Sequence, residues 1–296
     1  MSIFCIGQSA YDIITPVEEA IVENQKYRIT EMFECGGGPA LNAAFLCALW
    51  GADTCLISRI GQDEYGKRLR NIMENVGVRL EYLIEDDEIQ TPYSFIYSNS
   101  KTGSRTLFNF PGKLKAVEYN YPKEKVDVIL SDGHEPDISL KAIKTYPGAV
   151  SVADAGTCRE GTLAVAKESD YLVCSEDFAR QYTGKALNLK NWTLCESVFQ
   201  EVEQINQKQA VITLGAEGLL YKKNGIVTHM PAYPAAAVDT NGAGDVFHGA
   251  FAYGVWRGME LEEILKLSSM AAAISVQTYG AQSSIPRLES VCEKIR

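Results

Sequence analysis

The chain has 296 residues, and its hydrophobic content of 46% and charged content of 22% are ordinary for a globular protein. Its formal net charge of −10 argues against nucleic acid and anionic membranes as partners, because both are themselves negatively charged. The eight cysteines show no C-x-x-C spacing, which argues against a structural zinc site. The first residues lack a basic region and a cleavage site, and no apolar run is long enough to cross a membrane, so we expect a cytoplasmic protein.

The chain begins with a short apolar run, Ile3 to Gly7, which ends in glycine and is typical of a buried strand. Asp12 follows shortly after this run. In open α/β sheets, ligands bind beyond the carboxyl ends of the strands, so Asp12 is a candidate substrate-binding residue. The alternative is a solvated loop carboxylate.

A glycine-rich loop, residues 36–38, leads into an apolar helix that runs from Pro39 to Trp50. Proline near the first helical position is a sound helix start. Asn42 interrupts the apolar first turn, and a buried Asn must find hydrogen-bond partners. Those partners are either the hydroxyls of a ligand above the glycine loop or the residue's own backbone.

Two segments predict a small β-sheet that is separate from the main sheet. Residues 91–110 alternate around a turn from Asn99 to Gly103, which is the pattern of a β-hairpin, and residues 13–33 alternate more weakly. The aromatic residues of the hairpin indicate that it packs outside the main sheet. We expect this sheet to be a lid over the substrate, a dimer surface, or both.

From residue 126 onward, apolar strands alternate with helices, which predicts a parallel sheet covered on both faces. We therefore expect one α/β domain, residues 1–296, with the lid inserted in it. The glycine turn from Gly215 to Gly218 is either a nucleotide contact or a plain tight turn. Strands are expected at 126–130, 150–153, 171–174 and 210–214, and helices at 138–146, 160–168, 176–182, 194–207 and 261–279.

The segment from Asp239 to Asp245 reads Asp-Thr-Asn-Gly-Ala-Gly-Asp and joins a turn to an apolar helix. Its glycines let the backbone bend and approach a ligand, and the first N–H groups of the helix can point at an anion. Asp245 in the first turn could then remove a proton from a substrate hydroxyl. The alternative is a capped helix in which Asp245 only complements the helix dipole.

Taken in order, these segments and the run Gly61-x-Asp63-x-x-Gly66 resemble the ribokinase-like (PfkB) carbohydrate kinases over essentially the whole chain. The most specific motif is Asp239–Asp245, and the second is Gly37-Gly38-x-x-x-Asn42. The resemblance implies a three-layer α/β sandwich with a mainly parallel central sheet and a small β-sheet lid. It also implies ATP and Mg²⁺ as cofactors, and in some members a monovalent cation.

The resemblance implies a role for each matching residue. Asp245 would be the catalytic base. The anion hole for the transferred phosphoryl group would be formed by Asn241, Gly242, Ala243 and Gly244. The sugar would be bound by Asp12, Gly37, Gly38 and Asn42, with Arg105 of the lid reaching phosphate, as in ketohexokinase-like members. The nucleotide would contact Thr213, Gly215 and Gly218, with Ala272 and the segment from Gly280 to Ser284 beside the adenine.

One departure concerns the metal. Many family members carry Asn-x-x-Glu where this chain has Ser175 and Phe178. Glu176 or Asp177 could replace that Glu, but a shift of one or two residues turns a side chain to another helix face. The magnesium ligands are therefore left unassigned.

The sequence predicts an ATP-dependent kinase that phosphorylates a hydroxyl of a monosaccharide, with a homodimer formed through the lid. Two alternatives stay open: a nucleoside or inositol-type kinase of the same family, and a non-catalytic sugar- or nucleotide-binding regulator. A dinucleotide-dependent oxidoreductase is disfavoured, because no G-x-G-x-x-G follows the first strand.

Overall fold

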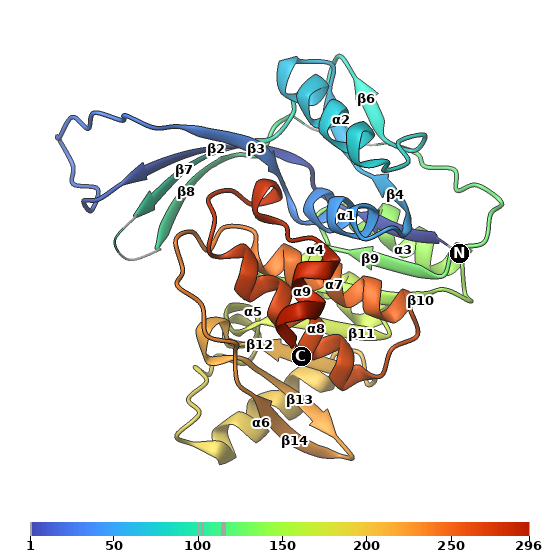
Figure 1. Cartoon of the computed structure of the whole chain (residues 1–296). Helices are drawn as coiled ribbons and strands as arrows, with labels where there is room; N and C mark the ends of the chain where they lie inside the picture. Colours follow the sequence, from blue (N-terminus) through green and yellow to red (C-terminus); the bar gives the residue numbers. More distant parts are fainter. Residues whose placement is uncertain (1, 100, 102–103, 114–116, 296) are drawn as a thin grey trace.

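The computed structural model describes residues 2–99, 101, 104–113 and 117–295. Within them, the main sheet has eight strands in the order β14-β13-β12-β11-β10-β9-β1-β4 (Figure 1). Neighbouring strands from β4 to β12 are parallel, and the β12, β13 and β14 pairs are antiparallel. The bounds are β1 (Ser2–Ile6), β4 (Asp53–Ile57), β9 (Val128–Ser131), β10 (Val150–Ala155), β11 (Tyr171–Ser175), β12 (Gln209–Thr213), β13 (Leu219–Lys223) and β14 (Ile226–Met230).

Helices cover both faces of this sheet because its strands carry apolar side chains on both sides. In β1, Ile3 and Cys5 enter the core on one face, whereas Phe4 and Ile6 enter a separate core on the other. The first face is covered by α1 (Pro39–Leu49), α2 (Glu64–Val76), α7 (Ala243–Trp256), α8 (Leu261–Ser275) and α9 (Leu288–Ile295). The second is covered by α3 (Pro136–Thr145), α4 (Glu160–Glu168), α5 (Glu176–Thr183) and α6 (Trp192–Glu203).

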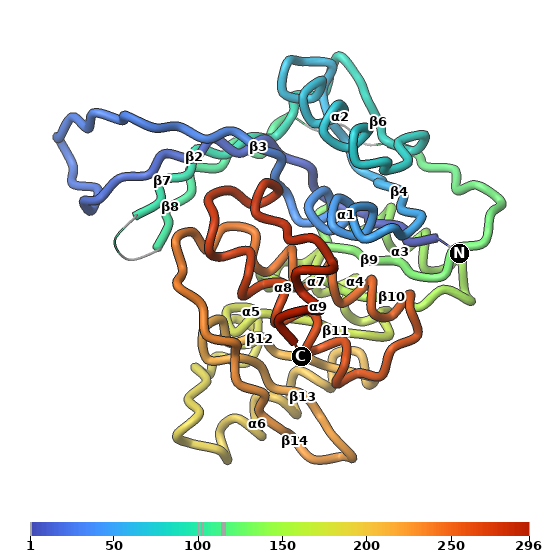
Figure 2. Tube along the Cα trace, viewed as in Figure 1, coloured from blue at the N-terminus to red at the C-terminus, as the bar shows by residue number. Residues whose placement is uncertain are grey.

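A second sheet, called here the small sheet, has the strand order β3-β2-β7-β8 and projects from the main body (Figures 1 and 2). Its strands are β2 (Ala10–Val17), β3 (Phe33–Gly37), β7 (Tyr93–Asn99) and β8 (Arg105–Phe110). A short pair, β5 (Arg59–Gly61) and β6 (Ile84–Asp86), lies near α2. The α/β fold expected from the sequence, with a mainly parallel sheet and a separate small one, is confirmed.

The small sheet differs from the sequence prediction in one respect. Its N-terminal half comes from β2 and β3, and residues 18–32 between them contain no strand. Asp12 therefore lies inside a strand and is not a loop residue. Within the predicted hairpin turn from Asn99 to Gly103, residues 100 and 102–103 lie outside the described part of the chain.

Helix α8 ends at Ser275, four residues before the predicted end at Tyr279. The reason is tertiary: the carbonyl of Val276 accepts hydrogen bonds from the N–H groups of Val238 and Asp239, at 2.7 and 3.1 Å. The end of α8 is thus tied to the segment that precedes α7. No helix in the described ranges is long and apolar enough to span a membrane.

Candidate active site

The site is built around Asp245 in the first turn of α7. The side-chain amide of Asn42, on α1, donates a hydrogen bond of 2.6 Å to a carboxylate oxygen of Asp245. The two helices come this close because Gly249 of α7 faces Ala43 of α1, where an added Cβ would lie 3.0 Å from the Ala43 Cα. Asn42 is fully buried, and its Oδ1 has no hydrogen-bond partner within the described part of the chain.

A second amide–carboxylate pair, Asn241 with Asp12, adjoins the pair of Asn42 and Asp245. The side-chain amide of Asn241 donates to Asp12 at 3.0 Å, and the Asn241 N–H donates to Asp239, also at 3.0 Å. The other oxygen of Asp239 accepts from the Gly280 N–H at 3.0 Å. The backbone N–H and the side-chain amide of Asn241 both donate hydrogen bonds to carboxylates, so Asn241 links Asp12 to the turn before α7. We call Asp12, Asn42, Asn241 and Asp245 the polar cluster.

The glycine loop before α1 leaves space for this cluster. A Cβ on Gly37 would lie 2.4 Å from the Asp12 carboxyl carbon, and one on Gly38 would lie 2.5 Å from the Gln8 carbonyl oxygen. Gly38 also has a φ of +90°, which disfavours other residues. Both glycines thus position Asp12 and the start of α1.

The N-terminus of α7 is shaped by two different glycines. Gly242 has a φ of +75°, and a Cβ there would lie 2.5 Å from the Ala281 Cβ. A Cβ on Gly244 would meet nothing within 4 Å, because Gly244 faces a cavity that Ala243 also lines. The Ala243 N–H donates to the Thr240 carbonyl at 3.4 Å. Since the first N–H groups of a helix lack intrahelical partners, those of Gly244 and Asp245 are available to an anion in the cavity.

The cavity has a volume of about 880 Å³, which is within the range of about 300–1,000 Å³ that is usual for small-molecule sites. Seven residues predicted from the sequence line it: Arg105, Thr213, Gly215, Gly218, Ala243, Gly244 and Ala272. Sequence reasoning missed other lining residues, chiefly Tyr233 to Ala235, Ala237 and Phe247. The loop from 232 to 237 carried no signal, because it has neither periodicity nor a motif.

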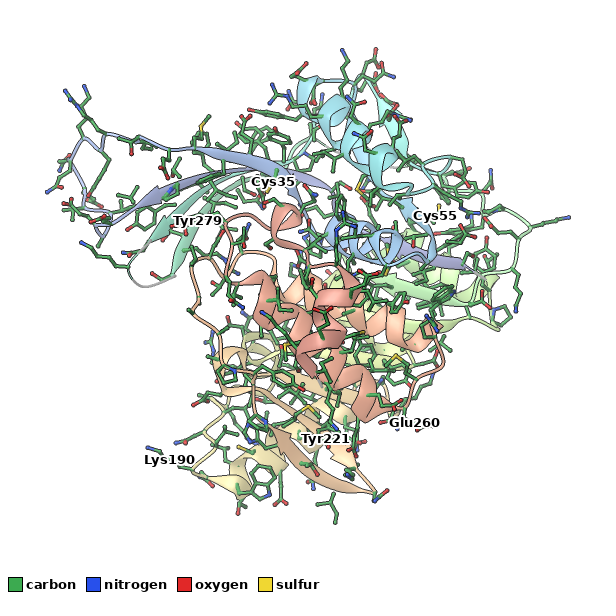
Figure 3. The ribbon with its side chains drawn as sticks, in the orientation of Figure 1. Cys35, Cys55, Lys190, Tyr221, Glu260 and Tyr279 are labelled. Carbon is green, nitrogen blue, oxygen red and sulfur yellow. The ribbon has the colours of Figure 1, made fainter. Side chains whose placement is uncertain are left out.

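Two residues predicted beside the nucleotide, Gly280 and Ser284, are not among the residues that line this cavity. The N–H of Gly280 donates to Asp239, and a Cβ on this glycine would lie 3.2 Å from the Cys35 sulfur. The buried Ser284 donates its hydroxyl to the carbonyl of Ala281. Neither residue lines the cavity. Their segment packs against the small sheet: Tyr279, which is labelled in Figure 3, stacks on Phe33 with ring centroids 5.3 Å apart.

Arg105 connects the small sheet to the α7 turn. Its guanidinium donates a hydrogen bond of 2.7 Å to the hydroxyl of Thr240 and also lines the cavity. The strand register pairs Arg105 with Ser98, and it pairs Asp12 with Ser94 and Ser94 with Asn109. Because alternate residues share a face, Arg105 and Asp12 lie on the same face of the small sheet.

Ser94 is a site residue that sequence reasoning missed. It is buried next to Asp12 and hydrogen-bonds to it, which lowers the Asp12 pKa. The alternation in residues 93–98 contained the signal, since it puts Ser94, Ile96 and Ser98 on one face.

The carboxylates of the polar cluster have raised pKa values. Burial raises the pKa of Asp12 to about 6, against the hydrogen bonds from Asn241 and Ser94. Burial, followed by the charge of Asp154, raises the pKa of Asp245 to about 7. A carboxylate whose pKa lies near neutral pH is suited to accept a proton from a substrate hydroxyl.

The segment that departs from the Asn-x-x-Glu pattern begins at the cavity wall. The hydroxyl of Ser175 accepts from the Phe178 N–H and donates to the Gly156 carbonyl, while Phe178 is fully buried in the core. Glu176 and Asp177 line the cavity. In the described residues, no three His, Cys, Asp or Glu side chains gather to hold a metal ion.

Residues 1–288 match the model of the pfkB family of carbohydrate kinases. The chain is 25% identical over 305 residues to the ribokinase of Bacillus subtilis, covering 99% of this chain and 98% of that protein. It is 24% identical over 302 residues to the nucleoside kinase of Methanocaldococcus jannaschii, covering 99% and 96% of the two chains. The solved structure of Thermotoga maritima ribokinase is similar with a TM-score of 0.80 and 28% identity, covering 99% of this chain and 98% of that one.

Proposed function

Because the chain belongs to the pfkB family of carbohydrate kinases, we propose that it transfers the γ-phosphoryl group of Mg·ATP to a hydroxyl of a neutral monosaccharide, with Asp245 as the base. The members of this family are ATP-using phosphotransferases with alcohol acceptors. The observation that carries the proposal is the position of Asp245. It contacts Asn42 of the polar cluster, and the preceding residue, Gly244, lines the cavity.

The polar cluster favours an uncharged acceptor rich in hydroxyl groups. Asp12 and Asp245 accept hydrogen bonds when ionised, and the unpartnered Oδ1 of Asn42 is also an acceptor. Sugar hydroxyls supply the matching donors, whereas an anionic acceptor would be repelled by the two carboxylates. A nucleoside, the substrate class named for the M. jannaschii relative, offers ribose hydroxyls of the same kind and is the second candidate.

In the proposed reaction, Asp245 accepts the proton of the acceptor hydroxyl. The freed oxygen forms a bond to the γ-phosphorus while the bond from that phosphorus to the bridging oxygen breaks, and ADP leaves with the electron pair. The N–H groups of the first α7 turn, beside Ala243 and Gly244, and the guanidinium of Arg105 stabilise the charge on the transferred group. Asp245 then releases its proton to solvent.

Magnesium, when bound with the nucleotide, neutralises charge on the β- and γ-phosphates. Glu176 and Asp177 are the carboxylates of the cavity wall that would orient it, through water. The segment after α8 is the proposed place for a monovalent cation, because Asp239 holds Gly280 there. We expect the small sheet to close over the acceptor and exclude water.

The outer face of the small sheet is the proposed homodimer contact. Phe95 and Phe108 are cross-strand neighbours on the face opposite Asp12, and they are 45% and 58% exposed. Large aromatic side chains exposed together mark interaction surfaces.

A non-catalytic regulator on this fold is the remaining alternative. It would need no carboxylate with a raised pKa beside the helix N-terminus, so Asp245 favours the enzyme.

The test is ATP turnover over a panel of sugars and nucleosides, for wild type, Asp245→Asn and the control Asp87→Asn, which changes an exposed carboxylate. We expect one acceptor to be phosphorylated and the Asp245 variant to lose about 10²–10⁴-fold in kcat, while the control keeps wild-type turnover. Wild-type protein that phosphorylates no acceptor would favour the regulator. Full activity in the Asp245 variant would refute the assigned base.

A further inference from the structure

His248 is a buried titratable residue with no role in the mechanism above. It lies on α7, one helical turn after Asp245, and is only 3% exposed. Its Nδ1 lies 2.6 Å from the Gly244 carbonyl oxygen and 3.3 Å from a carboxylate oxygen of Asp154. Its Nε2 lies 3.0 Å from the Val173 carbonyl oxygen. Both ring nitrogens therefore face oxygen atoms.

This geometry determines where the protons are. A carbonyl oxygen can only accept, so Nε2 beside Val173 must carry a proton. At 2.6 Å from the Gly244 carbonyl, Nδ1 must also carry one, because otherwise two lone pairs would face each other. The ring is then an imidazolium, and the carboxylate of Asp154 is its counter-ion. A cation in the first turns of a helix opposes the helix dipole, so His248 needs this partner.

Asp154 is suited to the pairing. It lies in β10, is 6% exposed, and a buried carboxylate without a partner is strongly disfavoured. Burial raises the pKa of Asp154 to about 8. Burial also lowers the pKa of His248, whereas the Gly244 and Val173 carbonyls and the charge of Asp245 act to raise it. These directions alone would place the shared proton on Asp154, whereas the carbonyl oxygens that face both ring nitrogens place it on His248. The other charged groups that act on Asp154 are Asp132, His134 and Arg159.

We propose that His248 and Asp154 form a buried imidazolium–carboxylate pair that positions the first turn of α7 and sets the proton affinity of Asp245. The first effect follows from the Gly244 carbonyl, which the ring holds immediately before the proposed base. The second is electrostatic. The carboxylate of Asp154 raises the Asp245 pKa and the cation of His248 lowers it, with Asp154 the stronger of the two. This inference rests on the proposed role of Asp245, and His248 is a positioning residue, because nothing places it on the substrate.

The sign of each effect gives opposite expectations for two variants. The acid limb of the pH profile of kcat/KM reports the protonation of the base in the free enzyme. Asp154→Asn removes the stronger, negative influence together with the imidazolium charge that depends on it, so the limb should still move to lower pH. His248→Asn removes the cation but keeps an amide donor, so the limb should move to higher pH. Each shift should be about one pH unit, as for other close charges. His229→Asn, at a half-buried ring on β14 whose Nε2 lies 2.7 Å from the Glu217 carbonyl oxygen, is the control and should leave the limb in place.

A second measurement needs no activity. In wild-type protein with ¹⁵N-labelled histidine, the His248 ring should show two protonated nitrogens at pH 7.5, and Asp154→Asn should abolish that signature. The chain has only three histidines, so His248→Asn identifies the signal.

The outcomes separate the two claims. Loss of phosphoryl transfer altogether, or full activity in Asp245→Asn, would reject the proposed function but leave the imidazolium measurable by NMR. A neutral His248 ring in the wild type would reject the pair. If the acid limb of the kcat/KM profile stays in place, or moves in the same direction in both variants, the pair does not set the proton affinity of Asp245, whatever the size of kcat.

Discussion

At the scale of single residues, the site consists of carboxylates that the fold buries, fully for Asp12 and Asp154 and in part for Asp245. Asp12, Asp154 and Asp245 have pKa values raised to about 6, 8 and 7, and burial is the largest cause in each case. Each is placed by a donor from a distant segment: Asn241, His248 and Asn42, respectively. Burying charge in this way costs stability, so we expect the site to be a weak point of the folded protein.

Asp12→Asn should make the protein more stable and weaken acceptor binding. A buried acid whose pKa is raised binds more protons in the folded state, so stability falls as pH rises from about 4 through 6. The variant removes that loss and should gain up to about 3 kcal/mol over wild type at pH 7.5, but only about 1 kcal/mol at pH 4.5. Urea unfolding at both pH values measures this, and acceptor KM should rise at least about tenfold. An equal gain at both pH values would contradict the assigned pKa.

At the scale of elements, the N-terminus of α7 contributes both to the stability of the fold and to the proposed chemistry. Gly242 supplies a left-handed backbone against Ala281, and Gly244 keeps the cavity open. The two glycines stand two positions apart in one motif and meet different surroundings, which makes them a matched pair.

Gly242→Ala and Gly244→Ala should separate folding from function. At position 242, the positive φ and the contact with Ala281 should together cost about 2–4 kcal/mol of unfolding free energy. At position 244, stability should be equal or slightly higher, because Ala favours a helix over Gly by about 1 kcal/mol. Its methyl group enters the cavity, however, so the KM for ATP should rise. Thermal unfolding of both variants measures the change in stability, and steady-state kinetics measures the change in the KM for ATP. Equal destabilisation, or an unchanged KM in Gly244→Ala, would contradict the assignment.

At the scale of the whole molecule, two sheets meet at the site. The contacts of the small sheet with the main body include Asp12 with Asn241, Arg105 with Thr240, and Phe33 with Tyr279. Its inner face is polar near the site, and its outer face exposes aromatic rings. The sheet thus presents one face to substrate and, in our proposal, the other to a second copy of the chain.

Phe108→Asp should dissociate the proposed dimer. Two carboxylates introduced into an apolar contact would be desolvated without partners. Light scattering coupled to size exclusion should give a dimer mass for the wild type and a monomer mass for the variant. Ile226→Asp, at an exposed residue on β14, is the control and should keep the wild-type mass. A monomeric wild type at micromolar concentration would reject the proposal.

Much of the architecture follows from local patterns. The apolar strands separated by helices predicted the covered parallel sheet, and the glycine turns predicted the starts of α1 and α7. Local steric and hydrogen-bonding rules are sufficient for these features, since they concern residues a few positions apart. The end of α8 was missed because a tertiary hydrogen bond to Val276 determines it.

The sequence by itself determined that Asp239–Asp245 forms a glycine-rich helix start, because φ preferences and unpaired N–H groups are properties of a single segment. Only the tertiary structure decided which side chains reach Asp245. Asn42 lies 203 positions away from it, and Asn241 lies 229 positions from Asp12. Contacts of this kind depend on strand order and helix packing, which no local pattern contains. His248 had no predicted role for the same reason: it lies on α7, whereas its partner, Asp154, lies on the distant strand β10.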